Sequence, residues 1–348
     1  MWRVSVRDLQ WRRRRFTIAV AATALVFAMT LLLSGASSSL SNANHRIVRL
    51  FGTDAWVVAA GSTGPFTTAS VIPAGLANEV AVEPGVARAE PVVLFRSTIH
   101  EKSVRDVNVV GYRPGGIMAP RVVRGRALRG RGETLADSAL GLRVGERVVA
   151  NGHRLRVVGL VSRVRFNFGV PTLLMPVEDA QALAFAGQPL ATAFITEGVP
   201  RTVPDGLHVV TDQQAISDLA RVAKSGNQSI AFINALLWIV AAGIIGSMVY
   251  LSALERVRDF AVLKATGASS RALLVGLALQ AVVLSFAGAI AAAVLAQPLA
   301  ASFPFPVEIP SGAYLRLLVI AVVVGTLASV AGLRRAVGVD PALAFSGA

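Results

Sequence analysis

Four long apolar runs, almost without charged side chains, constrain this chain more than any other feature of its sequence. They occupy residues 16–35, 230–252, 272–297 and 315–333, and a helix that crosses a bilayer needs about 20 mostly apolar residues. With 54% hydrophobic and 16% charged residues, the 348-residue chain cannot supply the polar shell that four buried helices would need in a soluble protein. We therefore predict a membrane protein with four transmembrane helices.

The first run follows a basic stretch, residues 1–15, which raises the alternative of a signal peptide, even a twin-arginine one. The run is longer than a usual signal core, and no clean small-residue cleavage site follows it. We predict an uncleaved membrane anchor. The arginines Arg12–Arg15 would then lie beside the membrane, where contact with anionic lipid headgroups is expected.

Basic residues also predict how the helices are oriented. They gather in residues 1–15, 253–271 and 334–348, whereas the only charged residues from 298 to 316 are Glu308 and, at the start of the fourth run, Arg316. By the positive-inside rule, both termini and the 253–271 segment are cytoplasmic. Residues 36–229 then form a large domain outside the cytoplasm, and residues 298–314 form a short outer loop. The predicted location is the plasma or inner membrane.

The predicted outer domain has the length of a folded domain and a mixed α+β pattern. Strand-like runs include "AWVVAA", "PVVLFRSTI" and "VRDVNVVGY", and Asn151-Gly152 between two apolar-rich runs indicates a hairpin. Helices are expected near "PAGLANEVAV", "VEDAQALAFA" and "DQQAISDLARVAK". The polar stretch "SSSLSNANHR" is suited to continue the first helix beyond the membrane.

The sequence lacks several motifs that are typical of catalytic and nucleotide-binding sites. It has no G-x-x-x-x-G-K-[ST], no G-x-S-x-G, no cysteine and only four scattered histidines. We predict no enzyme activity and no directly bound cofactor or metal. Much of the net charge of +14 comes from basic residues in the segments predicted to be cytoplasmic. The sequence has no nucleic-acid-binding motif, so no nucleic acid partner is expected.

The stretch "RVVRGRALRGRG", from Arg121, is basic and broken by glycines. It is either a patch for anionic lipid or envelope polymer, or a solvated loop. We favour the solvated loop, because exposed charge runs are usually just solvated.

A short charged segment separates the second and third runs. Glu255 and Arg258 are three residues apart, as are Arg256 and Asp259, so a helix would bring each pair together. Gly267 is suited to end that helix. Such a segment either contacts a cytoplasmic partner or serves as an ordinary topology loop.

Small residues recur at helix-face spacing inside the second and third runs, which lets membrane helices approach closely. They predict either packing within one bundle or a moving or dimeric interface, and the residues are Gly243, Gly246, Ser247, Ser285 and Gly288. Gln280 and Gln297 are polar inside the third run, and a helix–helix contact is expected at either of them.

The segment after the second run resembles the signature of FtsX-like permeases, the MacB-type class of ABC transporter membrane subunits. The matching residues are Glu255, Arg256, Arg258, Phe260, Ala261, Leu263, Lys264, Ala265, Gly267 and Ala268. The tail "VDPALAF" is similar to the closing element of that family. The patterns "EPGVARAEPVV" and "LGLRVGERVVANGHRLRVVGLV" resemble its MacB-like core domain.

The resemblance implies a stand-alone permease subunit that works with a separate cytoplasmic ABC ATPase and with a second copy or a related permease. ATP would act through that partner and move the outer domain, for export or extraction of a hydrophobic, peptide or lipid-linked cargo. The implied ATPase-coupling residues are Glu255, Arg256, Arg258, Asp259, Phe260, Leu263, Lys264 and Gly267.

Two alternatives remain open at this level. One is an FtsX-like signal transmitter, which activates a cell-wall hydrolase and has an outer adaptor or that hydrolase as its partner. The other is a membrane-anchored binding protein without an ATPase. Gln280 departs from the family, in which an acidic residue is common at this position, so any role of that acid is in doubt for this chain.

Overall fold

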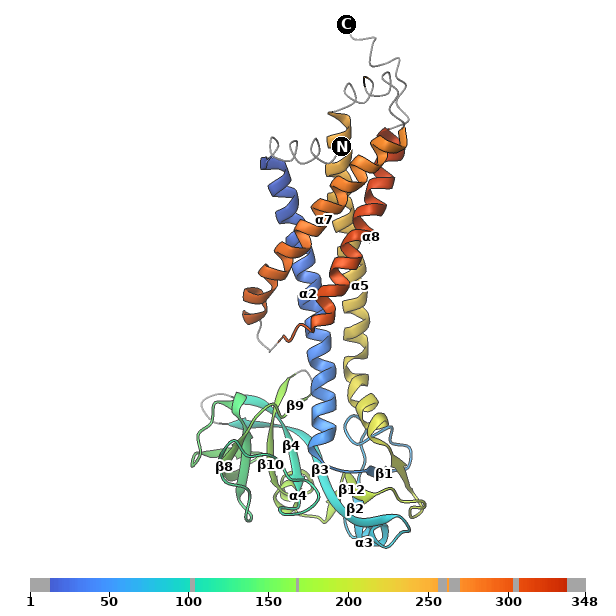
Figure 1. Ribbon diagram of the computed structural model, residues 1–348. Coiled ribbons are helices and arrows are strands. Elements are labelled where there is room, and N and C mark those ends of the chain that lie inside the picture. Colours follow the sequence, from blue (N-terminus) through green and yellow to red (C-terminus); the bar gives the residue numbers. More distant parts are fainter. Residues whose placement is uncertain are drawn as a thin grey trace. The chain divides into compact units, whose positions relative to one another are not determined.

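The computed structural model describes residues 13–100, 104–166, 169–255, 262, 270–302 and 307–336. The chain forms two compact units: a helical unit, Met1–Ser39 with Asn227–Ala348, and a sheet unit, Leu40–Gly226. The boundaries between them fall inside two long helices, α2 (Arg13–Leu50) and α5 (Asp212–Leu254). Each of these helices therefore contributes residues to both units, as Figure 1 shows in blue and yellow.

Both of these helices are longer than a bilayer requires. Helix α2 has 38 residues and α5 has 43, whereas about 20 suffice to span the hydrocarbon core. Each must therefore continue beyond the membrane. For α2, the extension includes the polar stretch at residues 37–46, as the sequence predicted.

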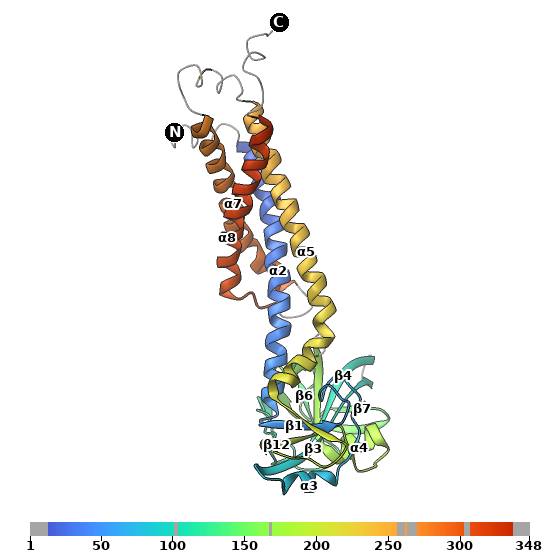
Figure 2. The same ribbon diagram turned by 90° about the vertical axis from the view of Figure 1, so that its right-hand side faces the viewer.

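The helical unit is completed by α7 (Ser270–Ala301) and α8 (Ser311–Ala336), which pack against each other (Figures 1 and 2). Three helical segments are long and apolar enough to cross a membrane: Phe16–Leu50, Gln228–Leu254 and Leu277–Ala301. Helix α8 covers the fourth predicted span, but the apolar part among its described residues is the shorter Ser311–Leu327. The count of four spans therefore stays a prediction.

The sheet unit is built around one mixed sheet in the described residues, with the order β13-β1-β12-β3-β4-β10-β6-β8-β5; β7 pairs with β3 and β8, and β9 with β10. Pairing is antiparallel except between β10 and β4 and between β6 and β8. The strands are β1 (Ala55–Ala59), β3 (Val86–His100), β4 (Val104–Tyr112), β5 (Arg124–Gly125), β6 (Glu133–Asp137), β7 (Arg147–Ala150), β8 (His153–Val161), β9 (Arg165–Phe166), β10 (Val170–Pro176), β12 (Ala193–Gly198) and β13 (Leu207–Val210). A separate pair joins β2 (Ile72–Pro73) to β11 (Leu190–Ala191).

Two short helices, α3 (Leu76–Ala81) and α4 (Val177–Phe185), pack on this sheet and complete the mixed α+β domain that the sequence predicted. Helix α3 contacts β3, and α4 contacts β3, β4 and β10. The 15-residue strand β3 holds the sheet together, because its first half pairs with β12 and its second half with β4.

The predicted hairpin is confirmed by the pairing of β7 with β8 across Asn151-Gly152. Both turn residues have positive φ, 46° and 79°. This is the backbone that a tight two-residue hairpin turn requires and that Asn-Gly adopts at low cost.

Candidate functional site: the helix–sheet junction

The two helices shared between the units join the sheet through neighbouring strands. Helix α2 is followed after four residues by β1, and β13 leads into α5 after Thr211. Strands β1 and β13 are antiparallel partners, with Trp56 opposite Val210. The end of α2 and the start of α5 therefore lie at the same end of one strand pair. We call this region, residues 47–68 with 207–219, the helix–sheet junction.

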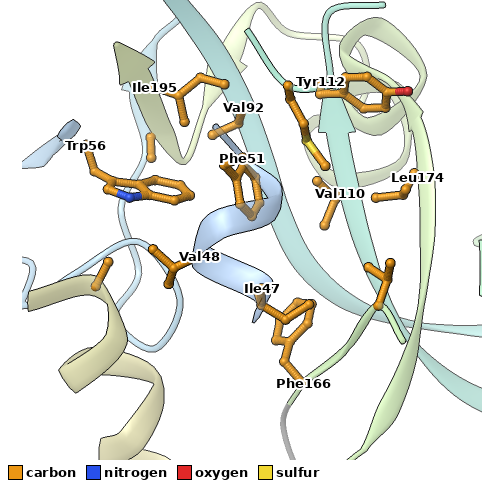
Figure 3. Close-up of a cluster of buried hydrophobic side chains, with 14 of the residues drawn as sticks. Ile47, Val48, Phe51, Trp56, Val92, Val110, Tyr112, Phe166, Leu174 and Ile195 are labelled. Carbon is orange, nitrogen blue, oxygen red and sulfur yellow. The ribbon is translucent and has the colours of Figure 1, made fainter. Parts of the chain in front are cut away.

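Buried aromatic side chains lie at the junction, where Phe51 and Trp56 pack beside Val48 (Figure 3). Phe51 packs edge-on against Trp56 at a ring-centroid distance of 4.6 Å, and Phe66 lies 5.3 Å from Trp56. Phe51 and Trp56 are fully buried. Because each aromatic pair contributes about 0.5–1.5 kcal/mol beyond its buried area, this cluster fixes the chain where it leaves α2.

The α2 side of the junction also has polar ties to the sheet. Thr53 Oγ1 donates to the carbonyl of Thr196 at 2.8 Å, and the amide of Thr196 donates back to Thr53 Oγ1 at 2.9 Å. The amide of Gly198 donates to Asp54 Oδ2 at 2.6 Å. The segment between α2 and β1 is thus bound to β12 and cannot move independently of the sheet without breaking these bonds.

The start of α5 is fixed by a capping box. The amide of Thr211 donates to Gln214 Oε1 at 2.9 Å, and the amide of Gln214 donates to Thr211 Oγ1 at 3.3 Å. Trp56 Nε1 donates to Asp212 Oδ1 at 3.2 Å, which links α5 to the aromatic cluster. Burial raises the pKa of Asp212, with a smaller contribution from the negative charge of Asp54.

One turn and a half further along α5, Asp218 holds the loop at residues 63–67. Its carboxylate is 1% exposed and accepts the backbone amides of Phe66 (2.8 Å) and Thr67 (3.1 Å). The hydroxyls of Thr63 and Thr67 also donate to it. A buried carboxylate is stabilised only when such donors surround it, so Asp218 and this loop form one polar connection between α5 and the sheet unit.

The predicted small residues separate into two groups. Ser285 and Gly288 of α7 are buried within the helical unit. A Cβ at Gly288 would lie 2.9 Å from Thr23 Cγ2 of α2, and a Cβ at Gly325 of α8 would lie 2.5 Å from Ser285 Oγ. These positions therefore lie where α7 approaches its neighbours closely.

Gly243 and Ser247 of α5 lie elsewhere. Both are exposed, and a Cβ at Gly243 would meet nothing within 4 Å in the part of the chain that the structure describes. The buried residues of this stretch, Ala241, Ile245 and Val249, recur every fourth position on another face. Gly246 is half-buried.

We expect Gly288→Val to destabilise the helical unit. The new side chain collides with Thr23 and forces α7 away from α2, and overpacking of this kind costs about 1–3 kcal/mol. Thermal unfolding in detergent measures the loss. Gly243→Val is the matched control, since it adds the same atoms to an open face. Equal losses for both variants would contradict the described packing of α2 against α7.

The predicted coupling segment lies mostly outside the described residues. Glu255 is exposed at the end of α5, whereas Arg256, Arg258, Asp259, Phe260, Leu263, Lys264 and Gly267 fall in the ranges that the structure leaves out. Gln280 of α7 exchanges hydrogen bonds with Ser252 of α5, at 3.2 and 3.3 Å. This is a helix–helix contact of the kind expected, and it joins the two helices that flank the segment. Gln297 is exposed instead.

In the Arg121–Arg131 stretch, two arginines have acidic partners. Arg126 pairs with Glu133, and Arg131 lies 3.6 Å from Asp179. Arg121, Arg124 and Arg129 are exposed. The stretch contains the short edge strand β5 rather than loop alone.

The junction residues were not singled out in the sequence. The capping box was readable, because Thr211-Asp-Gln-Gln214 has the spacing of that motif before an apolar run. Asp218 gives no comparable signal, since an acid in a helix is most often solvent-exposed and its loop partners are about 150 residues away in sequence.

Comparison with known proteins identifies the family. Residues 231–341 match the C-terminal domain of FtsX-like permeases. Two proteins of Mycobacterium tuberculosis named ABC transporter permeases are 44% and 43% identical over 344 residues, covering 99% of this chain and of each relative. A protein of Staphylococcus haemolyticus named as a hemin transport system permease is 18% identical and covers 98% of both chains.

Solved structures give a weaker likeness. The periplasmic region of MacB from Actinobacillus actinomycetemcomitans covers 48% of this chain and 92% of its own, with 12% identity and a TM-score of 0.36. The extracellular domain of the transporter YknZ from Gram-positive bacteria gives 13% identity and a TM-score of 0.34. The fold of the sheet unit does not follow from scores this low.

Family membership rests instead on the full-length relatives and on the matched C-terminal domain. The chain belongs to the FtsX-like permeases of ABC transporters, and it is a multi-pass membrane protein.

Proposed function

We propose that this permease couples ATP hydrolysis by a separate cytoplasmic ATPase to movement of its sheet unit outside the membrane. The observation that carries the proposal is the continuity of α2 and α5, each a single helix with residues in both units. Since an unbroken helix transmits displacement along its axis, a shift of either helix reaches β1 or β13 directly.

The helix–sheet junction supports this function because its contacts join both helices to the same strand pair. The aromatic cluster, the Trp56–Asp212 bond and the Asp218 loop would have to break for the helices to slip past the sheet. We propose that displacement of α2 and α5 is therefore delivered to the sheet unit as a whole.

The coupling segment would receive the displacement. In this proposal residues from Glu255 to Gly267 dock on the ATPase, and ATP acts without binding to this chain. The Ser252–Gln280 pair would hold the two flanking helices together during docking. The working complex contains two permease chains, either two copies of this one or one copy and a related permease.

We also propose four spans, with both termini in the cytoplasm. Because the chain has no cysteine, single cysteines report topology cleanly. With a membrane-impermeant maleimide on intact cells, Val82→Cys and Gly312→Cys are expected to react, since Val82 is 83% exposed and Gly312 lies at the start of α8. Ala348→Cys should react only after permeabilisation. Labelling of Ala348→Cys in intact cells would rule out a fourth crossing by α8.

The proposed cargo is hydrophobic, peptide-like or lipid-linked. The helical unit offers few charged side chains within its spans, which suits mechanical work better than conduction of ions or sugars. The signalling alternative has the same mechanics and differs in the outer partner.

Purification of the tagged chain from its native membrane, with identification of what accompanies it, tests the proposal. We expect an ABC ATPase in near-equal amount. A cell-wall hydrolase in addition would favour signalling over export. Purification of the chain without any ATPase would instead favour the alternative of a membrane-anchored binding protein.

A further inference from the structure

The hairpin formed by β7 and β8 carries positive charges directly opposite one another. Arg147 pairs with Arg156, and Arg154 lies two residues before Arg156 on the same face of β8. All three are exposed. The other face of the hairpin is buried and includes Leu155. Like charges directly across a strand pair destabilise a sheet, so the Arg147–Arg156 pair has a cost in stability.

One acid lies beside the hairpin: Glu133 of β6 is opposite Arg156 in the parallel β6–β8 pair, but its ion pair among the described residues is with Arg126. Between Arg113 and Arg165 the sequence has twelve arginines and only three acidic residues. In the part of the chain that the structure describes, no acidic side chain forms an ion pair with Arg147, Arg154 or Arg156.

The three acids already have other partners. Glu133 is bound by Arg126, whose hydrogen bond lowers the pKa of Glu133 to about 2. Asp137 accepts from Arg165 at 3.0 Å. Glu146 accepts the backbone amide of Arg143 at 2.6 Å. Glu133 and Asp137 are thus paired with other arginines, and Glu146 forms no ion pair with the three hairpin arginines among the described residues.

We infer that the exposed face of the β7–β8 hairpin, defined by Arg147, Arg154 and Arg156, binds a linear phosphate polymer outside the cytoplasm. Residues two apart on a strand are separated by about 7 Å, and residues directly opposite by about 5 Å. Three guanidinium groups therefore face the solvent within the span of a few successive phosphates. Arginine is suited to this ligand, because its planar fork contacts phosphate oxygens bidentately.

A polymer fits this face better than a single phosphate does. Each contact on an exposed surface contributes only about 0–1 kcal/mol, so useful affinity requires several contacts made together. The face also lacks anchors for a protein or a membrane. Among the described residues of the sheet unit, every exposed large apolar side chain is a valine, including Val104 and Val144. Protein interfaces and membrane-bound surfaces rely on aromatic or larger aliphatic residues.

The test uses the full chain in nanodiscs of zwitterionic lipid, with fluorescently labelled inorganic polyphosphate as the probe. The variant R147Q/R154Q/R156Q is compared with R113Q/R201Q/R221Q, which removes the same net charge at three exposed arginines elsewhere in the sheet unit. We expect the hairpin variant to weaken binding at least about 10-fold and the control less than about 3-fold. By analogy with single-stranded nucleic acid, the slope of log affinity against log salt should fall by about 2.

The hairpin variant should also unfold at the same or a higher temperature, because a like-charge pair is removed. This keeps loss of binding distinct from loss of folding. If both variants weakened polyphosphate binding equally, the binding would depend on net charge alone, and the inference would be overturned. So would failure of the unaltered chain to bind polyphosphate at physiological salt, or a hairpin-dependent binding seen only with phosphatidylglycerol vesicles. None of these outcomes depends on the ATPase, so they leave the proposed function untouched.

Discussion

Reversing two charges in the coupling segment, by Arg256→Glu with Arg258→Glu, is expected to separate the permease from its ATPase. A basic segment is expected to dock on an acidic surface of its partner. After the reversal, two negatively charged surfaces would face each other, and such a contact costs several kcal/mol. We expect the ATPase recovered with the tagged chain to fall more than about 30-fold, which corresponds to about 2 kcal/mol. Stimulation of ATP turnover by the permease should be lost to the same extent.

The matched control reverses Arg334 and Arg335, a second basic pair on the predicted cytoplasmic side. This control changes the net charge of the chain and of its cytoplasmic side by the same amount as the Arg256 and Arg258 variant does. We expect most of the ATPase still to co-purify with it. Labelling of Val82→Cys in both backgrounds verifies that the chain still inserts in the same orientation. Full recovery of the ATPase with the Arg256 and Arg258 variant would show that coupling occurs elsewhere.

Removing the buried carboxylate of the junction, by Asp218→Ala, is expected to loosen α5 from the sheet unit. The amides of Phe66 and Thr67 lose their acceptor, and each buried donor left unsatisfied costs about 1–3 kcal/mol. For a unit of this size we expect the Tm of the sheet unit to drop by about 5–15 °C. Hydrogen exchange at residues 63–67 should accelerate at least about 10-fold.

Asp205→Ala serves as the control, since Asp205 is exposed in the same unit and its loss should change neither quantity. Asp218→Asn keeps the shape and one acceptor oxygen, so we expect an intermediate effect. If Asp218→Ala left both the Tm and the local exchange unchanged, the loop would not be a connection between α5 and the sheet.

The parts of the fold set by local patterns were predictable from the sequence. Apolar length predicted the three long apolar helical segments in α2, α5 and α7, and the Asn151-Gly152 turn predicted the β7–β8 hairpin because few other residues tolerate two successive positive φ angles. The start of α4 at Val177 follows from a proline and two acids, Glu178 and Asp179, in its first turn.

What escaped prediction depends on contacts between distant residues. No local pattern indicates that β1 pairs with β13 about 150 residues later, and the junction exists only because of that pairing. The helical continuity of α5 was equally hidden, since its polar start and its apolar span read as two separate elements. Asp218 was not recognised because its donors come from a loop that is distant in sequence.

Spin-label distance measurement within one chain tests the central claim most directly. Labels at Val82→Cys in the sheet unit and Gly312→Cys in the helical unit are both exposed, and dilution with unlabelled chain isolates the distance within one copy. In complex with the ATPase, we predict that the distance distribution shifts between the nucleotide-free and ATP-trapped states, and that Asp218→Ala broadens or abolishes the shift. An unchanged distribution in a complex that hydrolyses ATP at its normal rate would contradict the account.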